Sequence, residues 1–119
     1  MSSYSRMRRV NSIVLHVLAE EVERLKDPRL EMVSITGVDT APNLRRATVF
    51  FSTLDLDRAD ETKAALESAA PRLRKLLGDE VRMKYTPALE FELDQGVAGG
   101  ARIDEILASI ATEKKDEEE

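Results

Sequence analysis

The chain has 119 residues, of which 42% are hydrophobic and 34% charged, and this composition predicts a single folded domain rather than a disordered chain. The absence of cysteine excludes disulfide bonds, thiolate zinc sites and a cysteine nucleophile, and it agrees with a reducing, cytoplasmic location. The formal net charge is −5, and residues 113–119 are expected to form an acidic disordered tail behind a domain of residues 1–112. Apolar runs are too short to span a bilayer, so no membrane partner is expected.

The first half of the chain predicts a helix followed by a hairpin. Apolar residues recur at helical spacing over residues 6–26, and Asp27-Pro28 should end this helix because proline lacks the amide donor. Residues 32–39 alternate apolar and polar side chains and predict a strand with a bulge at Gly37. Residues 40–44 are typical of a turn with its corner at Asn43, and residues 45–54 predict the second strand.

The residues after the hairpin have helical composition. Two short helices are predicted at 58–69 and 71–77, because Pro71 is favoured in the first turn of a helix and damaging in the middle of one. Asp55 or Asp57 is expected to cap the first of these helices, and Gly78 is expected to end the second.

The last part of the chain predicts a strand and a helix. Apolar residues of odd number over residues 81–93, among them Tyr85 and Phe91, predict one long strand with an irregularity at Pro87. A glycine-rich connector and a short helix at 103–110 follow. The element order helix, strand, strand, helix, helix, strand, helix predicts an α+β fold, with a small three-stranded sheet and helices on one face.

The side chains offer little for catalysis. The only histidine, His16, falls on the polar side of the first helix, one turn before Glu20. It lacks the further partners that a metal site or a nucleophilic triad needs. We therefore predict no catalytic residue, no metal ion and no cofactor, and a protein that is not an enzyme.

Basic residues are concentrated in short windows despite the negative net charge. Residues 1–19 contain three arginines and no acid, and residues 71–85 contain five basic residues and two acids. Such windows can bind phosphate, and the scarcity of aromatic residues favours contacts to the backbone and shape of structured RNA over base stacking. The predicted RNA-binding residues are Arg8, Arg9, Arg45, Arg46, Arg72, Arg74, Lys75, Arg82 and Lys84.

An ordered set of short motifs covering residues 6–110 resembles the ribosome-binding factor A family. The motifs are Arg8-Arg9-Val10, Asp27-Pro28-Arg29-Leu30, Val33-Ser34-Ile35-Thr36-Gly37-Val38, Pro42-Asn43-Leu44-Arg45, Leu73-Arg74 with Leu76-Leu77, Arg82-Met83-Lys84, Pro87-Ala88-Leu89-Glu90-Phe91, Asp94, Gly100 and Arg102-Ile103. The resemblance implies a type II KH-like fold and binding to the small (30S) ribosomal subunit and its 16S rRNA late in maturation. It also implies support of 5′-end processing and a role in cold adaptation.

The resemblance further implies a helix-kink-helix where ordinary KH domains carry a GXXG loop. The family's kink is Ala-x-Gly. Ala69 matches its alanine, Ala70 is the middle residue, and Pro71 stands where glycine is usual. Because proline can start the second helix, the kink is expected to survive.

Two other functions remain open from the residues alone. The chain could be a general KH-like RNA-binding adaptor for other transcripts, or a protein-interaction module whose charges only keep it in solution. DNA is not an expected partner, and nothing in the sequence demands more than a monomer.

Overall fold

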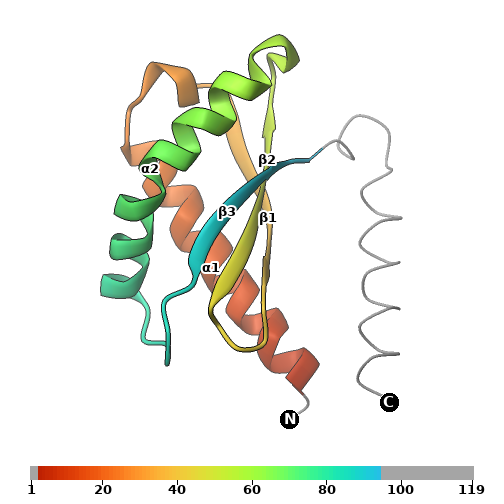
Figure 1. Ribbon diagram of the computed structural model, residues 1–119, viewed down its shortest axis with the longest axis vertical. Coiled ribbons are helices and arrows are strands. Elements are labelled where there is room, and N and C mark those ends of the chain that lie inside the picture. The colour runs from red at the N-terminus through yellow and green to blue at the C-terminus, as the bar shows by residue number, and fades with distance from the viewer. Residues whose placement is uncertain (1–2, 95–119) are drawn as a thin grey trace.

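The computed structural model describes residues 3–94 as two helices and three strands: α1 (Ser3–Arg24), β1 (Val33–Thr40), β2 (Arg46–Thr53), α2 (Ala59–Glu80) and β3 (Ala88–Leu93). An antiparallel β1–β2 pair and a parallel β2–β3 pair form one sheet of order β1-β2-β3. Both helices pack against one face of this sheet (Figure 1). The predicted α+β fold is confirmed, whereas the predicted helix at 103–110 and the tail at 113–119 lie outside the described residues.

The hydrophobic core lies between the sheet and the two helices. Strand β2 contributes Ala47, Val49 and Phe51, which are buried and alternate with more exposed neighbours as predicted. The helices contribute side chains that are completely buried: Val14, Leu18, Leu66, Leu73 and Leu77. Removing this apolar surface from water is the main stabilising contribution to the fold.

The hairpin follows the prediction except at its corner. The pairing register shifts between Ile35 and Gly37, which confirms the bulge. At the turn, Leu44 rather than Asn43 adopts the left-handed conformation, with φ 63°. Asn43 instead accepts a hydrogen bond at Oδ1 from the backbone N–H of Arg45 at 2.9 Å, and this local bond stabilises the turn.

Helix α2 is one continuous helix, so the prediction of two helices, the second ending at Gly78, was wrong. Its buried residues Leu66, Leu73 and Leu77 follow one another at helical spacing across Pro71. Packing of this continuous stripe therefore outweighs the hydrogen bond that Pro71 cannot donate. In Figure 1 the axis of α2 changes direction along the helix, as expected when proline lies in the interior.

The predicted caps of α2 are also absent from the described structure. A 3₁₀ turn at Leu56–Arg58 precedes the helix, and Arg58 occupies the N-cap position. The Asp55 carboxylate instead lies 3.8 Å from the Arg58 guanidinium, and neither Asp55 nor Asp57 caps α2.

Strand β3 is shorter than predicted. It begins at Ala88, whose N–H donates to the carbonyl of Arg45 at 2.9 Å, and residues 82–87 are irregular. Pro87, which has no N–H to donate to a strand, is fully buried just before β3. As a consequence Arg82 and Lys84 lie on a loop rather than a strand, and Tyr85 is 37% exposed rather than part of the core.

Candidate nucleic-acid interface

An open groove of ≈ 500 Å³ runs between the second half of α2 and the loop that leads to β3. Its lining combines four basic side chains with one aromatic ring, and consists of Arg45, Pro71, Arg74, Lys75, Gly78, Lys84, Tyr85 and Thr86. The parallel pairing of β2 and β3 brings Arg45, the residue just before β2, beside the start of β3. Four of the nine predicted RNA-binding residues therefore meet in one groove.

Arg74 fixes the loop to the helix. Its Nε and Nη2 atoms donate hydrogen bonds to the carbonyl oxygen of Thr86 at 3.1 Å and 2.9 Å. A charged donor that makes two bonds to one acceptor holds that acceptor in a defined position. Arg74 thus has a structural role in shaping the groove as well as a positive charge that faces solvent.

Tyr85 gives the groove a flat aromatic surface. The guanidinium carbon of Arg45 lies 3.7 Å from the ring centroid, and Nζ of Lys84 lies 5.6 Å from it. Such cation–π contacts are worth about 0.5–1 kcal/mol at an exposed site. They orient two cations from distant parts of the sequence next to the same ring.

Gly78 allows the helix and the loop to approach closely. A Cβ atom at this position would lie 2.9 Å from the side-chain oxygen of Thr86. Together with Tyr85 and Thr86, Gly78 is a groove residue that charge and motif do not select from the sequence. A glycine inside a helical pattern can signal such a close approach, but near the end of the pattern it also predicts the end of the helix, and Gly78 fits both.

The other predicted residues lie around this groove or apart from it. Arg72 and Arg82 are exposed, on α2 and on the loop after it, but they do not line the groove. The guanidinium of Arg46 forms an ion pair with the carboxylate of Glu90 on β3. Ala69 and Ala70 are half-buried against the core, and Pro71 lines the groove.

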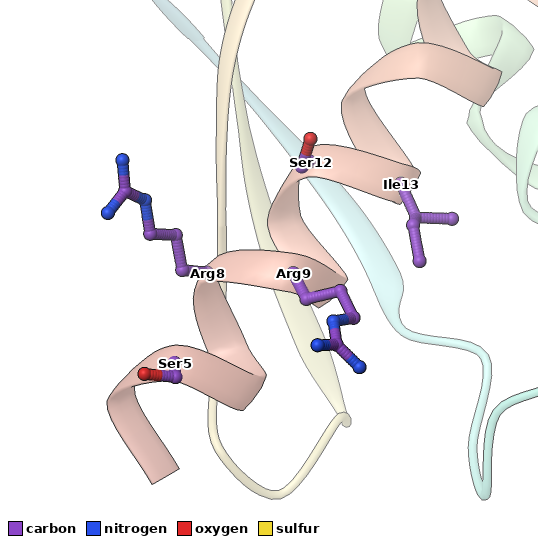
Figure 2. Close-up of a pocket in the computed structure, with 5 residues that line it drawn as sticks. All are labelled: Ser5, Arg8, Arg9, Ser12 and Ile13. Atoms are coloured by element: carbon purple, nitrogen blue, oxygen red, sulfur yellow. The ribbon is translucent and has the colours of Figure 1, made fainter. Parts of the chain in front are cut away.

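Arg8 and Arg9 lie on a second shallow surface, at the start of α1. Figure 2 shows that their side chains point to different sides of the helix, beside Ser5, Ser12 and Ile13. One turn further along α1, Asn11 accepts a hydrogen bond from the backbone N–H of Thr40 at 2.8 Å. The start of α1 is therefore held near the end of β1, so that it lies at the same end of the sheet as the hairpin turn and the loop before β3 (Figure 1).

Nothing in residues 3–94 forms a metal-binding cluster of three or more histidine and acidic side chains. His16 is exposed, and its Nε2 lies 3.5 Å from the carboxylate of Glu20 on the same helix. No helix within this described part of the chain is long and apolar enough to cross a membrane.

The family model of ribosome-binding factor A matches residues 6–107. The chain belongs to the ribosome-binding factor A family. It is 38% identical over 115 residues to the ribosome-binding factor A of Rubrobacter xylanophilus, an alignment that covers 96% of this chain and 94% of the relative.

Solved structures of the family have the same fold. The chain is similar to the crystal structure of ribosome-binding factor A from Thermus thermophilus, with a TM-score of 0.69, 28% identity, and coverage of 73% of this chain and 94% of that one. It is also similar to a Thermus thermophilus ribosome-binding factor A homology model fitted into a cryo-electron microscopy map of a 30S complex. That match has a TM-score of 0.58 and 30% identity, and it covers 67% of this chain and 86% of the other. The KH-like fold of ribosome-binding factor A is therefore the fold of this chain.

Proposed function

We propose that this protein binds the small ribosomal subunit in the cytoplasm and contacts its 16S rRNA through the groove between α2 and the loop before β3. The supporting observation is the convergence of Arg45, Arg74, Lys75 and Lys84 around Tyr85 in a member of a ribosome-binding family. A member of this family has been fitted into a 30S complex. The nearby Arg8, Arg9, Arg46, Arg72 and Arg82 would extend the interface across the same end of the molecule.

The groove suits structured RNA. Lysine ammonium groups bind phosphates as point charges, and a guanidinium stacked on a ring offers a planar donor to a phosphate or a base edge. The double helix of RNA is recognised largely through its shape, its phosphates and its 2′-hydroxyl groups. Removing one cation that binds a phosphate should lower the slope of log affinity against log salt by about 0.7–0.9.

The protein would act by binding energy alone, without catalysing a reaction. A factor that binds one conformer of the immature rRNA better than others shifts the population toward that conformer. Dissociation would then follow when maturation removes the preferred conformer. Support of 5′-end processing and of growth in the cold would follow from this stabilisation, because RNA escapes from misfolded conformers more slowly at low temperature.

The test is binding to purified small subunits, measured by co-sedimentation at several salt concentrations. The variant Lys75→Glu/Lys84→Glu reverses two groove charges that form no ion pair within residues 3–94, and it leaves the hydrogen bonds of Arg74 intact. The control Lys26→Glu/Lys63→Glu makes the same change in net charge away from the groove. We expect the groove variant to lose binding and the control to retain it.

Equal loss of binding in both variants would mean that net charge alone matters, and full binding by the groove variant would refute the proposed interface. Affinity for a 16S rRNA fragment is then compared with affinity for an unrelated structured RNA of the same length. Equal affinity for the two RNAs would support a general KH-like adaptor instead. In cells, deletion of the gene should cause 16S precursors to accumulate, most strongly at low temperature.

A further inference from the structure

The end of the molecule opposite the groove exposes large apolar side chains. Met32, Leu54 and Leu56 are 55%, 83% and 64% exposed. Exposed apolar residues are common one at a time, but neighbouring ones that gather on a surface mark interaction sites.

Met32 and Leu54 lie opposite each other because of the hairpin register. Val33 pairs with Thr53, and the N–H of Leu54 donates to the carbonyl of Met32 at 3.3 Å, which continues the pairing by one residue. Leu56 follows two residues later in the 3₁₀ turn before α2. We call Met32, Leu54 and Leu56 the apolar end surface.

Carboxylates flank the residues of this surface along the chain. Residues 54–61 contain four acids and one arginine, and Glu31 precedes Met32. Arg58 is paired with Asp55, and Arg29, two residues before Glu31, is paired with Asp27. Both arginines therefore already have acidic partners. Asp57, Asp60 and Glu61 are exposed carboxylates that take no part in these two ion pairs.

The charge decides which occupant fits. A nucleic acid would be repelled by these carboxylates, and its phosphates gain nothing from exposed leucine. The last described residue, Asp94, lies near this end, since its N–H donates to the carbonyl of Phe51 at 2.7 Å, and residues 95–119 follow it in the sequence. However, that segment contains seven acids and three basic residues, so it does not complement an acidic surface.

We propose that the apolar end surface is a docking site for a basic helical segment of a partner protein, with leucine-like side chains on one face and lysine or arginine beside that face. The apolar side chains of the segment would cover Leu54 and Leu56, and its cations would face Asp57, Asp60 and Glu61. Strand β2 separates this site from Arg45, and its eight residues span about 26 Å. The protein could therefore hold RNA at one end and a basic protein at the other.

The test uses the full chain labelled with ¹⁵N and a synthetic helical peptide made only of leucine and lysine, with the leucines on one face. Backbone amide shifts should change at residues 31–32 and 54–61. The same peptide with glutamate in place of lysine should leave them unchanged. The variant Leu54→Ser/Leu56→Ser should weaken binding by about tenfold or more, because each leucine loses burial against the peptide.

Two further variants separate the outcomes. Asp57→Asn/Asp60→Asn should weaken binding and reduce its dependence on salt, while Ile13→Ser, which removes an exposed apolar side chain beside Arg9, should have no effect. Shifts confined to the acidic residues after Asp94, or equal binding of both peptides, would overturn the proposal. None of these results depends on ribosome binding, so they leave the proposed function untouched.

Discussion

Replacing Thr40 with valine should stabilise the protein. Thr40 is 3% exposed, at the end of β1, and its hydroxyl oxygen has no hydrogen-bond partner among the described residues. Its backbone N–H is satisfied by Asn11, whereas its side-chain hydroxyl is buried without such a partner among the described residues. A buried, unsatisfied hydroxyl costs about 1–3 kcal/mol, and valine has nearly the same shape without it.

The expected gain is about 1–2 kcal/mol in the free energy of unfolding, since part of the desolvation cost is relieved by local adjustment. For a domain of this size, each kcal/mol corresponds to about 4 °C or more in Tm. Urea denaturation followed by circular dichroism should show a higher midpoint with an unchanged slope.

Thr48→Val is the matched control. Thr48 is half-buried on the neighbouring strand β2, where it pairs with Asp39, and its replacement brings the same increase in strand propensity. The difference between the two variants therefore reports the buried hydroxyl alone. If Thr40→Val gained no more stability than Thr48→Val, the Thr40 hydroxyl would have to be hydrogen-bonded, contrary to the prediction.

Three further predictions concern the groove and the helices. Gly78→Ala should weaken RNA binding and lower stability, because its new methyl group would lie 2.9 Å from the side-chain oxygen of Thr86. The double variant Gly78→Ala/Thr86→Ala should recover both RNA binding and stability. If Gly78→Ala alone changed neither RNA binding nor stability, the close approach would be contradicted. The protonated carboxyl of Glu80 donates a hydrogen bond to the neighbouring carboxylate of Glu21, and this bond, together with partial desolvation and repulsion between the two carboxylates, raises the pKa of Glu80. The folded state therefore holds a proton more tightly than the unfolded chain, and stability falls as pH rises through that raised pKa. Glu80→Gln should therefore raise Tm at neutral pH, and its Tm should match that of the parent at a pH below the ordinary pKa of glutamate. An equal gain in Tm at the two pH values would exclude the raised pKa of Glu80 as the cause. His16→Ala should leave both subunit binding and Tm nearly unchanged, and a large loss of binding would revive a functional role for that side chain.

Local patterns in the sequence are sufficient to predict the elements whose side chains form the core. The alternation of Ala47, Val49 and Phe51 predicts β2 because each of these side chains is buried against the helices. Gly37 predicts the bulge because it interrupts the alternation of apolar and polar residues, and the extra residue must then lie in one strand without a partner on the other.

The errors arise where tertiary packing overrides a local rule. Pro71 disfavours a helix interior, but buried leucines on both sides keep α2 continuous. Tyr85 has the parity of a buried strand residue, yet the chain does not enter the sheet until Ala88, so the ring is left in the groove. Basic residues can be selected from charge alone, but which of them meet depends on the pairing of β2 with β3, and no local pattern encodes that pairing.

The parallel pairing of β3 with β2 also determines when the groove can exist during synthesis. Arg45 is made early, and Lys84 and Tyr85 emerge later, after all of α2. The two walls meet only when Ala88 bonds to the carbonyl of Arg45, a contact between residues far apart in sequence that forms late because a long loop must close first. An incomplete chain that lacks β3 would present scattered cations instead of a groove, so only a fully folded protein would offer the proposed RNA interface.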